Sequence, residues 1–241
     1  MLLPCRALVS RALTTPPPLP PPLSTPPQPP SWSSANFWNS YYDRKAGAAS
    51  FDWFTDDAAL LQRIATATSP PNSNTPLSVL HIGAGTSSLA ELLHASLPPN
   101  STLVHTDFSP TAIAALTARL DATLDATLCA KHQVVQADIR TATLAAFNQT
   151  APFDVIVDKG TLDVFVHAHS DPCFAQTLAT LHELLSPTGR YIMATNDEPE
   201  LRFDMLLKHG GNLFDLSTMT IQNLSDDDVE ISLLTLKPKA A

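Results

Sequence analysis

The sequence is poor in cysteine, glycine and basic residues. It has 3 cysteines, 7 glycines, and 14 Lys and Arg against 23 Asp and Glu, which gives a formal net charge of -9 at pH 7. Cys129 and Cys173 lack the spacing of a zinc site or of a disulfide framework, so we expect reduced thiols and no metal. An acidic chain repels phosphate backbones, which argues against nucleic acid as a partner and favours a basic protein surface or a small molecule.

Acidic residues are absent from residues 1–42, and no long apolar run occurs anywhere in the chain. A membrane span needs ~18 apolar residues, so no membrane partner is expected. Residues 1–13 are basic and weakly apolar, and residues 14–30 are mostly Pro, Leu, Ser and Thr. We predict that residues 1–35 are a disordered, Pro-rich presequence of the organelle-transit type and that residues 36–241 form the folded domain. A mitochondrial destination is favoured, with plastid, cytoplasm or a plain disordered tail as alternatives.

Apolar strands alternate with amphipathic helices from residue 56 onward. The pattern predicts helices over 56–68, 87–97, 110–128, 141–147, 172–185 and 198–208, and strands over 78–82, 102–106, 132–136, 153–157, 190–195, 213–220 and 229–236. Two aromatic clusters around a loop precede them. This alternation predicts an α/β, Rossmann-like fold. We expect seven mostly parallel strands, helices on both faces of the sheet, and a C-terminal antiparallel hairpin.

Four predicted strands end in groups suited to a nucleoside. Gly83-Ala84-Gly85 follows the first strand, Asp107 the second, Asp138 the third and Asp158 the fourth. Glycine allows the backbone to turn tightly against a ligand. A carboxylate at the end of the second strand can accept hydrogen bonds from ribose hydroxyls. Because the carboxyl ends of parallel strands share one edge of the sheet, these groups predict a nucleoside-cofactor site there.

Two classes of cofactor fit this edge. A dinucleotide site favours Gly-x-Gly-x-x-Gly, but the sixth position of the motif is Ser88 here. The sequence also has no plausible Tyr-x-x-x-Lys or similar hydride-transfer group. Both observations disfavour a nicotinamide dehydrogenase. S-adenosylmethionine has no phosphate and does not need the anion-binding turn. It needs a carboxylate for its ribose and a polar contact near its adenine, which Asp138 supplies.

Two motifs resemble those of class I, seven-stranded S-adenosylmethionine-dependent methyltransferases. Val79-Leu-His-Ile-Gly-Ala-Gly-Thr-Ser-Ser-Leu89 resembles motif I, and Thr106-Asp-Phe-Ser-Pro110 resembles the acidic motif that follows it. Asp154-Val-Ile-Val-Asp-Lys-Gly-Thr-Leu-Asp163 resembles the signature of the protein lysine methyltransferases that modify elongation factor 1-alpha and mitochondrial citrate synthase. The resemblance extends over about residue 36 to the C-terminus. It implies a protein substrate with an accessible lysine, and an organelle presequence agrees with it.

The resemblance also implies roles for individual residues. Asp158 and Asp163 are the implied catalytic residues, which orient the amine and pass its proton outward. Trp53, with Phe54 and Trp38, is implied to cover the cofactor or to line the lysine channel. The implied cofactor-binding residues are Gly83, Ala84 and Gly85 beneath the cofactor, Asp107 on the ribose, Phe108 on the adenine, and Asp138 and Ile139 beside the base.

One position departs from the family pattern. The family usually has an acid two residues before the first motif glycine, where this chain has His81. Either cofactor affinity is reduced or Asp158 compensates. The departure leaves an inactive methyltransferase-like assembly factor of an organelle as an alternative, and a methyltransferase that acts on a small metabolite is a separate alternative. Lys159 is expected to be a solvated loop charge, and Asp197 and Glu198 to be either solvated or in contact with a basic substrate segment.

Overall fold

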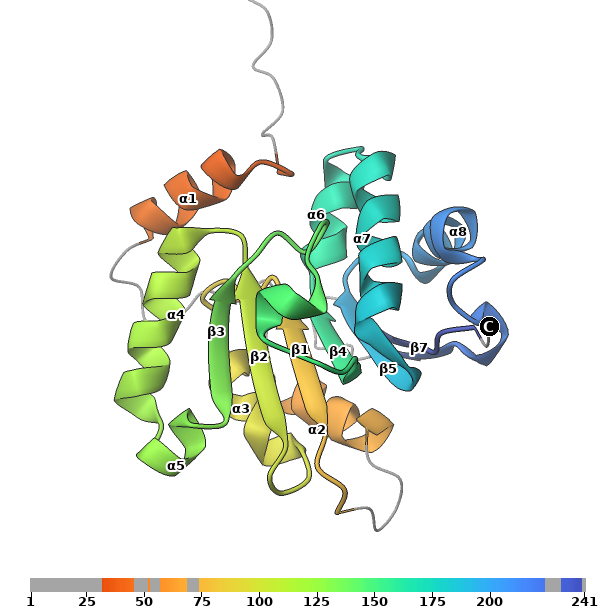
Figure 1. Ribbon diagram of the computed structural model, residues 1–241. Coiled ribbons are helices and arrows are strands. Elements are labelled where there is room, and N and C mark those ends of the chain that lie inside the picture. Colours follow the sequence, from red (N-terminus) through yellow and green to blue (C-terminus); the bar gives the residue numbers. More distant parts are fainter. Residues whose placement is uncertain (1–31, 46–51, 53–56, 69–73, 224–230, 240–241) are drawn as a thin grey trace, which may run out of the picture.

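One seven-stranded sheet forms the centre of the molecule. The computed structural model describes residues 32–45, 52, 57–68, 74–223 and 231–239. Within this part of the chain the strand order is β3-β2-β1-β4-β5-β7-β6 (Figure 1). The strands are β1 Ser78–Ile82, β2 Thr102–Asp107, β3 His132–Gln136, β4 Phe153–Lys159, β5 Leu185–Thr195, β6 Thr220–Asn223 and β7 Ser232–Leu236. Strands β1 to β5 pair in parallel, and β7 pairs antiparallel with both β5 and β6. The predicted fold class is confirmed.

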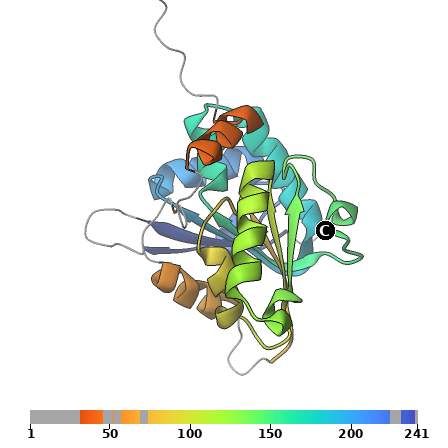
Figure 2. The ribbon, with the colours of Figure 1, turned by 90° about the vertical axis from the view of Figure 1, so that its left-hand side faces the viewer.

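Helices cover both faces of the sheet. They are α1 Ala35–Arg44, α2 Asp57–Thr68, α3 Leu89–Leu92, α4 Pro110–Thr123, α5 Ala126–Cys129, α6 Thr161–His167, α7 Asp171–Leu184 and α8 Pro199–Gly210, with 3-10 helices at Leu93–Ser96, Leu144–Phe147 and Leu216–Thr218. Figure 1 shows α7 in front of the sheet and α2 and α3 behind it. Seen from the side, α4 stands along the sheet next to β3 and α1 lies across its upper end (Figure 2).

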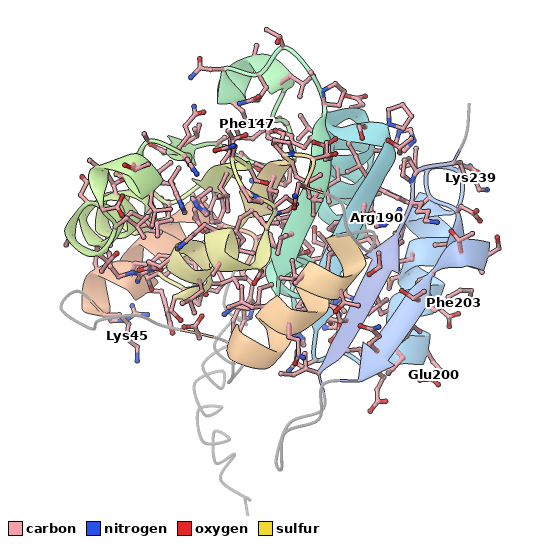
Figure 3. All side chains as sticks on the ribbon, turned by 90° about the horizontal axis from the view of Figure 1, so that it is seen from below. Lys45, Phe147, Arg190, Glu200, Phe203 and Lys239 are labelled. Carbon is pink, nitrogen blue, oxygen red and sulfur yellow. The ribbon has the colours of Figure 1, made fainter. Side chains whose placement is uncertain are left out.

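The central strands bury both of their faces, which explains their near-continuous apolar sequences. In β1, Leu80 and Ile82 pack into the core beneath α6, α7 and α8. Val79 packs into the core beneath α2 and α3 on the opposite face. Viewed from below, α1 with Lys45 and α8 with Glu200 and Phe203 lie at opposite sides of the molecule (Figure 3). The two faces of the sheet therefore pack into different hydrophobic clusters.

The order in which successive strands are added to the sheet reverses between β1 and β4. After β3 at one edge the chain returns to place β4 beside β1, and β5 then continues outward. In open α/β sheets ligands bind beyond the carboxyl ends of the strands at such a point. Helices α1 and α6 lie above this edge (Figure 1). The topology thus places the ends of β1, β2 and β4 around one location.

Several element boundaries differ from the sequence prediction. The predicted helix over 110–128 is divided into α4 and α5, because Asp125 begins a new helix by accepting hydrogen bonds from the N–H groups of Thr127 and Leu128. The predicted helix over 87–97 is a four-residue α3 followed by a 3-10 turn. The strand predicted at 213–220 lies instead at β6. Helices α1 and α6 were not predicted.

The predicted presequence, residues 1–35, falls almost entirely outside the described residues, so its boundary and its order stay predictions. Trp53 and Phe54 also lie outside them. In the part of the chain that the structure describes, no helix is both long enough and apolar enough to span a bilayer.

Candidate active site

A cavity of about 800 Å³, counting the open space at its mouth, lies at the carboxyl edge of the sheet. It brings together residues from β1, β2, β4, α1 and α6 and from the turn after β3. Its walls are formed by Trp38, Tyr42, His81, Gly83, Ala84, Gly85, Thr86, Ser87, Thr106, Asp107, Phe108, Ala137, Asp138, Ile139, Arg140, Lys159, Gly160, Thr161, Val164 and Phe165. All of the predicted cofactor-binding residues that the structure describes therefore line one cavity, and Trp53 lies outside the described residues.

The glycine turn after β1 forms the floor of the cavity. Gly83 and Gly85 have φ values of +53° and +52°, in the left-handed region that side chains rarely adopt. A Cβ on Gly83 would collide with Thr161, and a Cβ on Gly85 would lie 2.5 Å from the hydroxyl oxygen of Tyr42. Ala84 between them is buried, and its N–H donates to the carbonyl of Thr106 at 2.9 Å. The two glycines keep the floor open where a ligand has to approach the backbone.

Asp107 ends β2 with its carboxylate held in place by backbone donors. Its Oδ2 accepts a hydrogen bond from the N–H of Gly85 at 3.0 Å, and its Oδ1 accepts one from the N–H of Ser109 at 2.8 Å. Burial raises the pKa of Asp107 to about 6 against the lowering effect of these bonds. A carboxylate oriented in this way at a cavity wall can accept two further hydrogen bonds from vicinal hydroxyls.

Asp138 and its neighbours form the wall at the end of β3. Burial raises the pKa of Asp138, but hydrogen bonds from Arg140 outweigh burial and bring the pKa below its ordinary value. The closest of these bonds joins Arg140 Nη2 to Asp138 Oδ2 at 2.6 Å. Ile139 is buried at the same wall, and Phe108 packs with the aromatic residues of α1. These residues offer an apolar slot with a polar rim, which suits a purine base.

Helix α1 supplies an aromatic wall. Trp38 and Tyr42 are 5% and 8% exposed, lie on one face of α1, and both line the cavity. The indole N–H of Trp38 donates to the carbonyl of Trp32 at 2.6 Å, which fixes the ring. Trp38 was placed at the site by the resemblance to the methyltransferase family. Tyr42 belongs to the same aromatic cluster as Trp38 and was missed, because only the helical spacing i, i+4 of the two residues would have singled it out.

Asp158 lies beneath the site with its carboxylate turned toward α6. Its Oδ1 accepts from the N–H of Thr161 at 2.7 Å, and its Oδ2 accepts from the hydroxyl of Tyr191 at 2.8 Å and from the N–H of Leu162 at 3.3 Å. Burial raises the pKa of Asp158. Asp158 is not among the described residues that line the cavity, whereas its neighbours Lys159 and Gly160 are. Its predicted catalytic role stays a prediction, while its contacts are those of a residue that shapes the turn into α6.

Asp163 belongs to a buried ion cluster. Arg202, which is fully buried, donates through Nη2 to Asp163, to Asp197 and to the hydroxyl of Thr195. Burial raises the pKa of Asp163, and Arg202 opposes that shift. Asp163 is also absent from the described lining of the cavity, so its catalytic role stays a prediction as well. Asp197, which was expected to be solvated or substrate-bound, has a side chain only 7% exposed in this cluster.

Lys159 is buried, which corrects the prediction of a solvated loop charge. Its side chain is 3% exposed and its ammonium pairs with Asp52. No sequence signal marked this pair, because the partners are 107 residues apart. Among the described residues, no group of three or more His, Cys, Asp and Glu is placed to hold a metal ion.

His81 begins a row of three histidines across the sheet. Its Nδ1 lies 3.2 Å from Nδ1 of His105, and Nε2 of His105 lies 2.9 Å from Nδ1 of His132. Burial lowers the pKa of His81 to about 3 and that of His132 to about 4, and it lowers the pKa of His105 well below the ordinary value. The row is therefore neutral at pH 7, and position 81 contributes no charge to the cavity.

We expect the His105→Gln variant to be less sensitive to acid than the native protein. Above pH ~6.5 histidine is neutral in both the folded and the unfolded chain, so His105 contributes no pH dependence there. Below that pH the unfolded chain binds a proton at His105 that the folded chain cannot bind. The free energy of unfolding then falls by about 1.4 kcal/mol per pH unit through this residue. Urea unfolding at pH 7.5 and pH 5.5 measures the difference between the two proteins.

Comparing the two proteins removes the contribution of the titrating groups that do not contact His105. Asp107 and Asp163, whose raised pKa values act in the opposite direction as pH falls, are present in both proteins and cancel in the difference. The difference in stability between native protein and variant should shrink by about 1.4 kcal/mol between the two pH values. A difference that does not change with pH would mean that His105 has the same pKa in the folded chain as in the unfolded chain.

Comparisons with known proteins agree with this geometry. Residues 80–191 match the model of a family described as a methyltransferase domain. The chain is 29% identical over 180 residues to the mitochondrial citrate synthase-lysine N-methyltransferase of Pongo abelii, with 72% of each chain covered. It is 27% identical over 210 residues to the EEF1A lysine methyltransferase 4 of Mus musculus, with 77% of this chain and 75% of that protein covered.

Solved structures share the fold. The glycopeptide N-methyltransferase MtfA, crystallised with S-adenosyl-L-homocysteine, superposes with a TM-score of 0.60 at 14% identity, covering 82% of this chain and 97% of MtfA. The N-methyltransferase NodS of Bradyrhizobium japonicum gives 0.56 at 14% identity, covering 84% and 99%. The family match, the lysine methyltransferase relatives and the fold lead to one assignment. The chain is an S-adenosylmethionine-dependent methyltransferase with homology to protein lysine methyltransferases, and its fold is the Rossmann-like, seven-stranded one.

Proposed function

We propose that this methyltransferase transfers methyl groups to a lysine side chain of a protein, with citrate synthase as the first candidate substrate. The observation that carries the proposal is a single cavity that joins the Asp107 carboxylate and the glycine turn to the aromatic wall of Trp38 and Tyr42. Two relatives named as protein lysine methyltransferases support the substrate class. The net charge of -9 suits a basic protein segment better than an acidic one.

The residues at the nucleoside end fit S-adenosylmethionine. Asp107 has acceptor capacity left for both ribose hydroxyls after binding the N–H groups of Gly85 and Ser109. Ile139 and Phe108 form the slot for the adenine, with Asp138 at its rim. A Cβ at Gly83 would collide with Thr161 and a Cβ at Gly85 with Tyr42, and both of these residues line the same cavity. When bound, the cofactor supplies a methyl group on a sulfonium, and the carbon–sulfur bond breaks as the bond to the lysine nitrogen forms.

The protein has to bring the lysine to the site in a reactive state. An ammonium has no free lone pair, and free lysine has a pKa near ~10.4. Aromatic walls such as Trp38 and Tyr42 disfavour the charged amine and so lower that pKa, and the amine proton leaves to water. Val164 and Phe165 of α6 also line the cavity. Asp158 would then contribute to the site in two ways. It would hold the start of α6 in place, and it would make the predicted contact with the amine.

Incubation with labelled S-adenosylmethionine tests the proposal. Purified protein is mixed with citrate synthase, with an unrelated protein as control, and with an organelle extract, and labelled lysines are mapped by mass spectrometry. We expect label on a lysine of citrate synthase or of another extract protein. Label found only on small molecules would instead support a metabolite methyltransferase. Absence of cofactor binding would support the assembly-factor alternative that His81 left open.

We further propose a mitochondrial location, directed by residues 1–35. The acid-free, basic start of the sequence and the mitochondrial relative support it. A fusion of residues 1–35 to a fluorescent protein should enter mitochondria. A plastid or diffuse cytoplasmic signal would contradict the proposal.

A further inference from the structure

Lys159 places a positive charge at the wall of the cavity. It ends β4, which pairs with β1, and it lines the cavity together with His81 and Gly83. Since His81 is neutral, the nearest charge on this wall is the ammonium of Lys159. A buried cation requires a counter-ion, because burial without one costs several kcal/mol.

Asp52 supplies that counter-ion. Its Oδ1 accepts from Lys159 Nζ and from the hydroxyl of Ser87, and its Oδ2 accepts from the N–H and hydroxyl of Ser88 at 3.3 and 3.1 Å. Its side chain is 21% exposed. Burial raises the pKa of Asp52, but the bonds from Lys159 and Ser87 outweigh burial and lower it, so the carboxylate is ionised. Asp52 thus ties the end of β4 to the turn after β1.

The pair of Lys159 and Asp52 lies on the side of the cavity toward which the sulfonium end of the cofactor extends. Under the proposed function, Asp107 and Asp138 at the ends of β2 and β3 hold the nucleoside. The sulfonium and amino-acid part then extends toward β1 and β4, where Lys159 is found. That part carries two positive charges and one carboxylate. An unpaired ammonium on this wall would repel the sulfonium.

We propose that Asp52 is the positioning residue that neutralises Lys159 at the sulfonium end of the cofactor site. The proposal rests on the proposed function. It also assigns to Asp52 the compensation that the sequence prediction gave to Asp158, since both oxygens of Asp158 are engaged by α6 and Tyr191. Asp52 is not among the cavity-lining residues, so it acts through the charge of Lys159 and not by direct contact with the cofactor.

Comparing the affinities for S-adenosylmethionine and S-adenosylhomocysteine shows how the net charge of Lys159 and Asp52 acts on the sulfonium. The two differ by a methyl group and by the positive charge on sulfur. Asp52→Asn preserves the shape of the side chain and removes its charge. We expect it to weaken the binding of S-adenosylmethionine by about tenfold more than the binding of S-adenosylhomocysteine, as the loss of one negative charge at several ångströms in a partly solvated site would do.

Calorimetric titration of the native protein and four variants with both ligands completes the test. Lys159→Met should raise the preference for S-adenosylmethionine over S-adenosylhomocysteine, because it leaves the negative charge of Asp52 without the positive charge of Lys159. This variant keeps the proposal testable if Asp52→Asn does not fold. The double variant should return the preference to the native value. Asp171→Asn, which breaks the exposed pair with Lys208, is the matched control and should change neither affinity.

The outcomes separate the two proposals. Native protein that binds neither ligand would overturn the proposed function. Native protein that binds both, with Asp52→Asn weakening both equally or neither, would overturn the role of Asp52 in neutralising Lys159. A double variant that keeps the altered preference would overturn it as well.

Discussion

Replacing Asp107 with Ala should reduce the affinity for S-adenosylmethionine by at least about 100-fold and remove methyl transfer. The variant loses the acceptor for both ribose hydroxyls, and hydrogen bonds to a charged group contribute about 1.5–3 kcal/mol each. It also leaves the N–H groups of Gly85 and Ser109 without their present acceptor, which loosens the floor of the cavity. Calorimetric titration measures the affinity, and thermal unfolding of the same sample shows whether the fold persists.

The pKa of Asp107 gives an internal control for this result. With a pKa of about 6, the carboxylate is largely ionised at pH 7.5 and largely protonated at pH 5. The affinity of the native protein for the cofactor should therefore fall as the pH decreases through 6, and this decrease should be absent from the residual binding of Asp107→Ala. Native affinity in Asp107→Ala would show that the ribose is held elsewhere and that the site has been assigned wrongly.

Replacing Arg202 with Met should destabilise the fold by about 3–5 kcal/mol, the usual cost of leaving a buried charge without its partner. Asp163 and Asp197 would both lose their buried counter-ion. Chemical denaturation measures the loss. Asp163→Asn in the same background should recover part of it, because one of the two uncompensated charges is removed.

The same variants test whether Asp163 acts in catalysis. If Asp163 is only structural, Asp163→Asn should retain transfer as long as it stays folded. If it accepts the amine proton, transfer should be lost in a stable protein.

A stable Arg202→Met variant would contradict the predicted loss of about 3–5 kcal/mol in the free energy of unfolding.

The parts of the site that were predicted depend on local patterns. Gly83, Gly85, Asp107 and Asp138 each follow an apolar strand, and the parallel sheet then brings the strand ends together, so sequence order alone placed them in one cavity. What was missed depends on contacts between distant segments. Lys159 gave no local sign of Asp52, because nothing in its own turn distinguishes a buried lysine from a solvated one.

Helix α6 was missed for a related reason. Its sequence, Thr-Leu-Asp-Val-Phe-Val-His, is rich in β-branched and aromatic residues, which have low helix propensity. The helix is stabilised by the carboxylate of Asp158 at its start and by burial of Leu162 and Phe165. Both contributions come from tertiary structure. The division between α4 and α5, in contrast, was readable from Asp125, whose position before Thr127 and Leu128 marks a helix start.

The position of β7 has a consequence for how the protein is made. Strand β5 has β4 on one side and β7 on the other, and β7 is synthesised after every other strand that the structure describes. Until then β5 presents an unpaired edge, which in a nascent chain invites aggregation or chaperone binding. The sheet can be completed only after synthesis of residues 232–236 has finished.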